Sequence, residues 1–344
     1  MGVNLKDIVV KKEISIADLR GKRLVVDSYN ILYQFLATIR QMDGTPLTDS
    51  KGQVTSHLIG LLHRTTRLMQ KGMRLAFVFD GEPPALKSKE RQRRSQLKQE
   101  AQGKFEDAER AGDVEAMKKY AMRTSRLTPE MVREAKSLIE ALGLPVIQAP
   151  SEGEAQAAYM VKKGEVYAEI SQDYDCLLFG VPRLVQNLTI SERKKMPNKL
   201  SFETVKPQQI DLAENLKELG ISHTQLIALG ILVGTDFNPG GIKGIGPKNA
   251  LKLVKEHGED FEKLFSDVHW SEHFDHDWRE VFDIFTKLPS TDDYELKWKP
   301  VNREQVLKIL VDRHDFSKQR VEDVLEKLKK DQSTIAQKGL GGWM

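Results

Sequence analysis

Short apolar segments rich in β-branched and aromatic residues recur along the chain, and two of them end directly in an aspartate. The segments are clearest at residues 23–27 (RLVVD) and 74–80 (RLAFVFD), and LPVIQAP and VYAEISQD have the same character. Such crowding in a short span predicts buried strands. Stretches with helical character, such as residues 56–71 and 129–142, separate them. This alternation predicts an α/β fold with a mainly parallel, twisted sheet flanked by helices.

Two regions depart from this alternation. Residues 87–126 are polar, favour helix and contain few apolar side chains, so we expect them to project from the core. From Leu219 onward the chain is largely helical, with a glycine-rich interruption at residues 238–248. The stretch from Asp331 is rich in Gln, Ser and Gly, which predicts a flexible tail.

The composition is that of an ordinary globular protein, with 40% hydrophobic and 30% charged residues. A formal net charge of +3 does not by itself predict nucleic-acid binding, because the placement of the charges matters more. The single cysteine, Cys176, excludes an intramolecular disulfide. There is no apolar run of membrane-spanning length and no signal-peptide core at the N-terminus. We therefore expect a soluble, monomeric, intracellular protein without a membrane partner.

Acidic residues follow four of the predicted strands and should meet at one edge of the sheet, because the carboxyl ends of strands gather functional groups there. Clustered carboxylates repel each other and need counter-charge, and hard oxygen donors suit Mg²⁺ or Mn²⁺. Two such ions can activate a water and stabilise the leaving oxygen in phosphodiester cleavage. The eight histidines show no zinc spacing. The candidate ligands are Asp27, Asp80, Glu152, Glu154, Asp173, Asp175 and Asp236.

Each acid also has a structural interpretation. A single Asp after a strand is commonly a turn former or a helix cap. Ser151 and Glu154 fit a capping box, and acids at a helix start favour the helix dipole in any case. For Glu154 alone the structural interpretation is at least as well supported, and for Asp175 alone the two are about even. The joint arrangement of the acids favours a metal site.

Two further segments carry chemistry. GGIKGIGPKNA, residues 240–250, has the form of a helix–hairpin–helix, whose backbone N–H groups can hold a phosphate beside Lys243 and Lys248. The less favoured alternative is an ordinary glycine-rich loop. The basic segment that follows Asp80 would stand over the metal site, with Lys87 and Arg94 on one helix face. The alternative interpretation of this basic segment is an ordinary solvated helix face.

Tyr33 lies two turns beyond Asp27. An aromatic side chain at helical spacing is usually part of the core, although near a metal site it could stack on a displaced base. The residues alone favour the core.

These motifs together resemble the flap endonucleases of the structure-specific 5′ nuclease family. The resemblance rests on Asp27, Asp80, SEGEAQAAY, SQDYDCLLFG and GTDFNPGGIKGIGPKNA, and YQFLATIRQMDGTPLTDSKG and VFDGEPP resemble the archaeal type. It extends from about Gly2 to the C-terminus and implies a PIN-like 5′ nuclease fold. The implied divisions are a nuclease core over 1–330, with an N-terminal region at 1–98, a helical arch at 82–128 and an internal region at 140–258 that contains the hairpin at 238–250.

The resemblance implies a 5′-flap endonuclease and 5′–3′ exonuclease that acts in DNA replication and base-excision repair. The seven acids match the family's ligands for two Mg²⁺ ions, which Mn²⁺ can replace. Lys87 and Arg94 match its catalytic basic residues, and Tyr33 matches its base-stacking tyrosine, against the core interpretation. The hairpin would bind duplex DNA together with a monovalent cation. The expected DNA contacts are Arg40, Arg64, Glu152, Gly234, Asp236, Gly241, Lys243, Gly244, Gly246 and Lys248.

The family's tail implies a sliding-clamp motif within residues 331–344. Gln337, Leu340, Trp343 and Met344 fall in its register, with Met344 in place of the second aromatic. The glycines around them should make ordering of the segment costly, so we expect weaker clamp binding than the usual motif gives. The alternative is a glycine-rich tail without function.

The same residues are compatible with two other functions. A related 5′ nuclease that cuts bubbles or degrades processively would share the acids, although the short stretch between Asp80 and Thr128 argues against bubble cutters, which carry long insertions there. A non-catalytic junction binder would use the acids for a structural ion only. Flap, nicked and gapped DNA are the expected substrates, in the cytoplasm or nucleoid of an archaeal-type cell, or in a nucleus.

Overall fold

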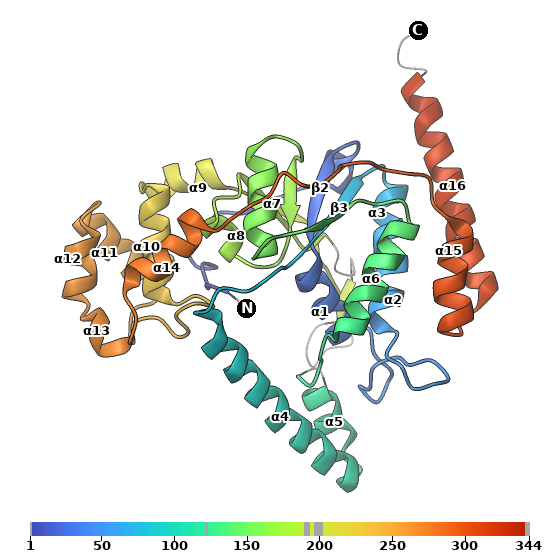
Figure 1. Cartoon of the computed structure of the whole chain (residues 1–344), viewed down its shortest axis with the longest axis horizontal. Coiled ribbons are helices and arrows are strands. Elements are labelled where there is room, and N and C mark those ends of the chain that lie inside the picture. Colours follow the sequence, from blue (N-terminus) through green and yellow to red (C-terminus); the bar gives the residue numbers. More distant parts are fainter. Residues whose placement is uncertain (1, 122, 189–192, 196–201, 341–344) are drawn as a thin grey trace.

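A seven-stranded sheet forms the centre of the fold (Figure 1). The computed structural model describes residues 2–121, 123–188, 193–195 and 202–340. Five adjacent strands run parallel, and two further strands extend one edge through antiparallel pairing. The predicted α/β fold with a mainly parallel sheet is confirmed. In spatial order the strands are β1 (Lys12–Glu13), β9 (Gln208–Asp211), β6 (Arg183–Gln186), β5 (Ala168–Ile170), β2 (Arg23–Asp27), β3 (Arg74–Phe79) and β4 (Val146–Gln148).

Helices cover both faces of the sheet, which explains why its central strands are apolar at successive positions. In β2, Leu24 and Val26 belong to one buried cluster, whereas Val25 belongs to the other. The first cluster lies under α1 (Ser28–Thr38), α2 (Ser56–Gly60), α3 (Thr66–Gln70) and α6 (Pro129–Ala141). The second lies under α7 (Gly153–Lys162), α8 (Asp175–Leu178) and α10 (His223–Val233). Consecutive strand residues therefore pack into different layers, as the pleat requires.

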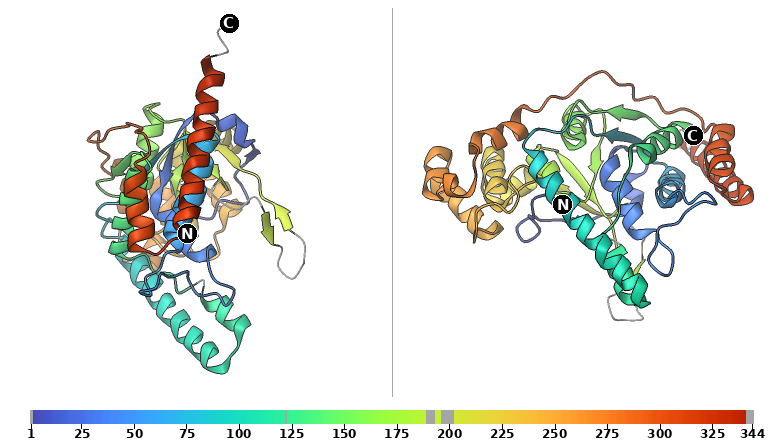
Figure 2. Two further views of the ribbon diagram at one scale, coloured as in Figure 1. Left: turned by 90° about the vertical axis from the view of Figure 1, so that its right-hand side faces the viewer. Right: turned by 60° about the horizontal axis from the view of Figure 1, so that its bottom comes forward.

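The basic polar region projects from this body, as its composition predicts (Figures 1 and 2). It contains α4 (Lys87–Ala111) and α5 (Val114–Ala121). Gly112, in the left-handed conformation with φ 66°, ends α4 and allows the chain to turn back. Among the residues of α4, only Glu90, Ala101 and Ala108 are buried, so the outer part of this arch is held mainly by packing between its two helices.

The C-terminal half is helical, as expected. A long segment without regular structure, residues 288–302, crosses back over the body and leads to the last helices (Figure 2). The remaining elements are a 3₁₀ turn (Ile16–Leu19), β7 (Arg193–Lys195), β8 (Phe202–Thr204), α9 (Leu212–Leu219), α11 (Pro247–His257), α12 (Phe261–Asp267), α13 (Trp270–His273), α14 (Trp278–Lys287), α15 (Arg303–Leu307), α16 (Lys318–Leu340), and π turns at Leu61–Thr65 and Lys308–Arg313. Within the described ranges no single helix has the length and apolarity to cross a membrane, and only the bent pair α9–α10 reaches them jointly.

The helix α16 continues to Leu340, past Asp331, where the flexible tail is predicted to begin. Residues 331–338 contain neither glycine nor proline, so nothing in their backbone stops the helix. The clamp-motif residues Gln337 and Leu340 lie in its last turns, and Trp343 and Met344 lie outside the described residues.

Candidate active site

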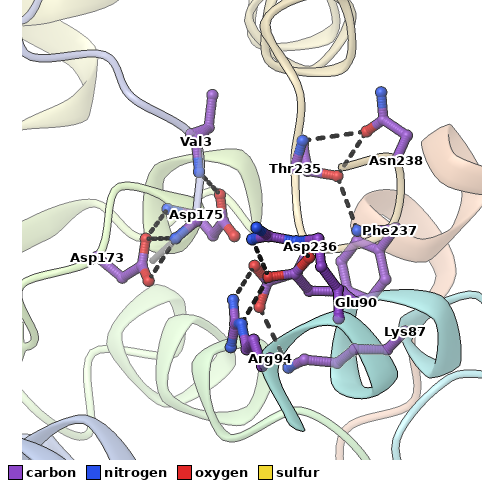
Figure 3. A network of polar contacts seen from close by, with 12 residues as sticks. Val3, Lys87, Glu90, Arg94, Asp173, Asp175, Thr235, Asp236, Phe237 and Asn238 are labelled. Atoms are coloured by element: carbon purple, nitrogen blue, oxygen red, sulfur yellow. Dashed lines mark hydrogen bonds and ion pairs between the residues drawn. The ribbon is translucent and has the colours of Figure 1, made fainter. Parts of the chain in front are cut away.

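Four adjacent strands deliver acids to the same edge of the sheet. Asp27 is the last residue of β2, and Asp80 follows β3 directly. Glu152 and Glu154 lie at the start of α7 after β4, and Asp173 and Asp175 follow β5. The order β5-β2-β3-β4 makes these strands neighbours, so their ends open at one place. Asp236 reaches the same place from the loop after α10 (Figure 3).

Local hydrogen bonds hold two of the central acids in place. Asp27 accepts from the backbone N–H of Asn30 at 3.1 Å, which caps α1, and from the hydroxyl of Ser171 at 3.2 Å. Asp80 accepts from the N–H of Gly153 at 2.8 Å. A Cβ on Gly153 would lie 2.7 Å from that carboxylate oxygen, so a larger residue there would push the Asp80 carboxylate aside. Asp27 is therefore a helix cap as well as a member of the cluster.

The capping-box interpretation of Glu154 is wrong. The N-cap of α7 is Glu152, and no side chain caps the helix. The hydroxyl of Ser151 donates instead to the carbonyl of Glu82 at 2.7 Å. Burial and then the carboxylates of Asp173, Asp175 and Asp27 raise the pKa of Glu154 well above its ordinary value. Its environment is that of an acid inside an acidic cluster.

The first residues of the chain close one side of the cluster, a feature that the sequence analysis missed. The N–H of Gly2 donates to both oxygens of Asp173, at 3.1 and 2.9 Å. The N–H of Val3 donates to Asp175 at 2.7 Å (Figure 3). A Cβ on Gly2 would lie 2.1 Å from an oxygen of Asp175, so a larger residue there would displace this carboxylate. The second position of the chain, which could have been any residue, is therefore part of the site.

Two basic residues of α4 meet the acids from the other side. The ammonium of Lys87 lies 2.5 Å from Glu152 and 3.8 Å from Asp236. The guanidinium of Arg94 lies 2.5 Å from Asp236 and 2.6 Å from Glu90. The prediction that Lys87 and Arg94 share one helix face above the acids is confirmed (Figure 3). The alternative of a solvated face does not apply to these two side chains.

The charge balance of the site calls for additional cations. Burial first, and neighbouring charges second, raise the pKa of Asp27 and of Asp80 to about 6. Burial also raises the pKa of Glu152 and of Asp236, despite the nearby Lys87 and Arg94. The pKa values rise because burial removes water from these carboxylates and the two basic side chains compensate only in part, and hard oxygen donors in such a setting fit divalent ions.

The acids do not yet surround a common point. In the part of the chain that the structure describes, no three carboxylate, histidine or cysteine side chains are gathered as ligands of one ion. The contacts of Lys87 with Glu152 and of Arg94 with Asp236 explain this, since each basic group occupies the oxygens of a candidate ligand. Burial would lower the pKa of Lys87, but the carboxylates of Glu152, Glu154 and Asp80 raise it above its usual range. The Lys87 ammonium therefore supplies positive charge among these acids, as a metal ion would.

The glycine-rich loop between α10 and α11 forms the predicted helix–loop–helix. Gly234 (φ 106°) and Gly241 (φ 58°) approach each other so closely that a Cβ on either would meet backbone atoms within 2.5 Å. Pro247 begins α11, and Lys243 and Lys248 are exposed. The loop also carries Asp236, so it joins the acidic cluster to a surface of exposed glycines and lysines, among them Gly244 and Gly246.

The other candidates have different environments. The ring of Tyr33 is 37% exposed, with the ammonium of Lys98 at 4.7 Å from its centroid, so the core interpretation is wrong. Its face of α1 points away from the sheet, which helical spacing alone cannot reveal. Arg40 donates to the carbonyl of Gly44 at 2.8 Å and to the hydroxyl of Ser125 at 2.5 Å. Arg64 lines a groove between α3 and α16.

Comparisons with known proteins agree with this geometry. Family models for the XPG N-terminal domain and the XPG I-region match residues 1–101 and 143–236. The flap endonuclease 1 of Thermococcus onnurineus is 50% identical over 343 residues, covering 100% of this chain and 99% of that protein. The corresponding protein of Pyrococcus abyssi is 49% identical, with coverages of 100% and 98%. The solved flap endonuclease-1 from Methanococcus jannaschii superposes with a TM-score of 0.75 at 43% identity, covering 97% of this chain and 99% of that one.

Proposed function

The chain belongs to the flap endonuclease 1 family, and on this premise we propose that it hydrolyses DNA where a single-stranded 5′ flap joins a duplex. The observation that carries the proposal is that Lys87 and Arg94 of the arch reach Glu152 and Asp236 at the edge of the sheet where four adjacent strands deliver acids. A 5′–3′ exonuclease activity would use the same site. In the cell it would serve Okazaki fragment maturation and base-excision repair, acting as a monomer on flap, nicked and gapped DNA.

The seven carboxylates would hold two Mg²⁺ ions, with Mn²⁺ able to replace them. We assign Asp80, Glu152 and Glu154 to the ion nearer the scissile phosphate, because these three acids act most strongly on Lys87 of the arch. The second ion would be held by Asp173, Asp175 and Asp236. Asp27 lies at the end of β2, the strand between β5 and β3. When bound, the ions would supply an activated water and stabilise the leaving oxygen.

Lys87 and Arg94 would change partners during the cycle. In the structure they neutralise Glu152 and Asp236. With these carboxylates holding divalent ions, the ammonium and the guanidinium would be available to the oxygens of the scissile phosphate, where charge develops in the transition state. The products would carry a 5′-phosphate and a 3′-hydroxyl. Tyr33 would stack on a base beside the cut, since its ring is exposed on the helix that Asp27 caps.

Duplex DNA would lie against the hairpin between α10 and α11. Its backbone N–H groups and the exposed Lys243 and Lys248 would hold phosphates without reading sequence, together with a monovalent cation. Gly234 and Gly241 give the loop its shape, and Gly244 and Gly246 leave its outer surface open to the backbone. Arg40 and Arg64 would contact DNA on the far side of the site. Arg40 would act through the loop that it holds by donating to the carbonyl of Gly44.

Cleavage of an end-labelled flap substrate with and without Mg²⁺ tests the proposed activity. We expect a Mg²⁺-dependent cut close to the single-strand/double-strand junction, with gapped DNA cut more slowly and bubble and blunt duplexes as poor substrates. A preference for bubbles over flaps would reassign the protein to another activity within the same nuclease family. Unchanged DNA in Mg²⁺ would refute a catalytic role.

We also propose that residues 331–344 bind a sliding clamp, the proliferating cell nuclear antigen. The register of Gln337, Leu340, Trp343 and Met344 supports this, as does the way α16 carries the C-terminal end away from the sheet (Figure 1). A peptide of residues 331–344 should retain the clamp from solution, and the Trp343→Ala peptide should lose it. If the unaltered peptide retains no clamp, the assignment fails. The archaeal sources of the relatives support a cytoplasmic, nucleoid-associated location.

A further inference from the structure

Glu90 occupies an unusual position for an acid on a projecting helix. It lies in the basic segment at the base of α4, and its neighbours Lys89, Arg91 and Arg93 are exposed. Glu90 itself is only 2% exposed. A buried carboxylate without partners would be strongly unfavourable, so its contacts must compensate for the lost hydration.

Two arginines provide that compensation. One oxygen of Glu90 accepts from Nε of Arg94 at 2.6 Å and from a terminal nitrogen of Arg93 at 2.8 Å. The other accepts from Nε of Arg93 at 2.7 Å. Burial would raise the pKa of Glu90, but the hydrogen bonds from Arg93 and Arg94 hold it below the ordinary value. Glu90 is therefore a carboxylate with its charge fully engaged.

The contact with Arg94 is directional. Glu90 holds the inner nitrogen, Nε, whereas a terminal nitrogen of the same guanidinium reaches Asp236 at 2.5 Å (Figure 3). An arginine bound only through its terminal nitrogens could swing about its long side chain. Because the guanidinium is planar, holding Nε orients both terminal nitrogens at once.

We propose that Glu90 is a positioning residue, which holds Arg94 by its Nε so that the terminal nitrogens face the scissile phosphate. The inference rests on the proposed nuclease function. If Asp236 turns to a divalent ion, Arg94 loses that partner and Glu90 remains to keep it in place. Glu90 touches neither the phosphate nor an ion in this account, and it acts only through Arg94.

A double-mutant cycle on the full-length protein tests this role. The cycle compares Glu90→Ala, Arg94→Ala and the double variant by single-turnover cleavage of a labelled flap in Mg²⁺. We expect Glu90→Ala to slow cleavage about 10–100-fold, the scale of a misplaced catalytic group, with flap affinity changed less than about twofold. In the Arg94→Ala background, Glu90→Ala should have no further effect, because its only route of action is gone. Glu90→Gln keeps an oxygen acceptor and should recover part of the rate.

The controls separate a positioning role from a structural one. Glu100→Gln makes a comparable change on the exposed part of the same helix and should cleave like the unaltered protein. If Glu90 only stabilised the arch, the double variant would be slower than Arg94→Ala by the full factor seen in Glu90→Ala alone, and flap affinity would fall as well. Either result would overturn the proposal, as would an Arg94→Ala variant that cleaves at the normal rate. Failure of the unaltered protein to cut the flap would instead refute the proposed function.

Discussion

The loop that carries Asp236 depends on one buried asparagine. Asn238 is 0% exposed, and its carbonyl oxygen accepts from the N–H of Thr235 at 3.1 Å and from its hydroxyl at 2.7 Å. Its amide donates to the carbonyl of Ile231 at 2.7 Å. The hydroxyl of Thr235 accepts in turn from the N–H of Phe237 at 3.1 Å, so these bonds bracket Asp236 on both sides.

Replacing Asn238 with alanine should therefore destabilise the protein measurably. Each of its three hydrogen bonds contributes about 1 kcal/mol, so their loss should lower the free energy of unfolding by about 3 kcal/mol. The value could approach about 5 kcal/mol, because the Thr235 N–H and the Ile231 carbonyl would remain buried without this partner. The loop would also no longer hold Asp236 in a fixed position. Mg²⁺-dependent flap cleavage should therefore slow, although Asn238 touches neither DNA nor metal.

Urea unfolding followed by tryptophan fluorescence measures the stability change, and single-turnover cleavage measures the functional one. Asn302→Ala is the matched control, because Asn302 is exposed and makes one capping bond, to the N–H of Gln305 at 3.0 Å. It should cost about 1 kcal/mol and leave cleavage unchanged. A loss below about 1 kcal/mol in Asn238→Ala, with normal cleavage, would refute the reasoning.

Two other substitutions probe features at a distance from the arch. Gly2→Ala should disturb Asp173 and Asp175, because the new Cβ would overlap their oxygens, and it should weaken Mg²⁺ binding as measured by calorimetry; unchanged affinity would contradict the contact. His57 is fully buried next to Glu134 and near His314. His314 itself contacts Asp49 and Glu134. Burial lowers the pKa of His57. The unfolded chain therefore binds more protons below about pH 6.5, and stability should fall as the pH drops through that value. His57→Gln should flatten this decline in the melting temperature between pH 7.5 and 5.5. An unchanged slope would show that protonation of His57 does not contribute to the pH dependence of stability.

The features that the sequence predicts best are those with local signals. Asp27 and Asp80 follow strands whose composition identifies them, and a parallel sheet brings the ends of neighbouring strands together. Lys87 and Arg94 share a face because they lie about two turns apart on one helix. The hairpin is recognisable from its glycines and the proline that begins α11.

The features that escape prediction depend on contacts between distant segments. Gly2 and Asp173 are 171 residues apart, and no local pattern links them. Glu90 looks like an ordinary acid in a basic run until its burial is known. Ser151 and Glu154 have the spacing of a capping box, but the hydroxyl of Ser151 donates to the backbone carbonyl of Glu82 instead. Tyr33 has core-like spacing, although its side chain lies outside the buried core and meets Lys98 of the distant helix α4.

We propose that acids at the ends of adjacent strands hold the ions needed for hydrolysis, while other elements hold the DNA. Asp80→Asn tests it most directly, because it removes one central carboxylate while leaving an oxygen that can accept from the N–H of Gly153. Flap binding and flap cleavage in Mg²⁺ should be measured on the same preparation. We predict that binding survives and cleavage is abolished. Retained turnover of the variant in Mg²⁺ would contradict the account.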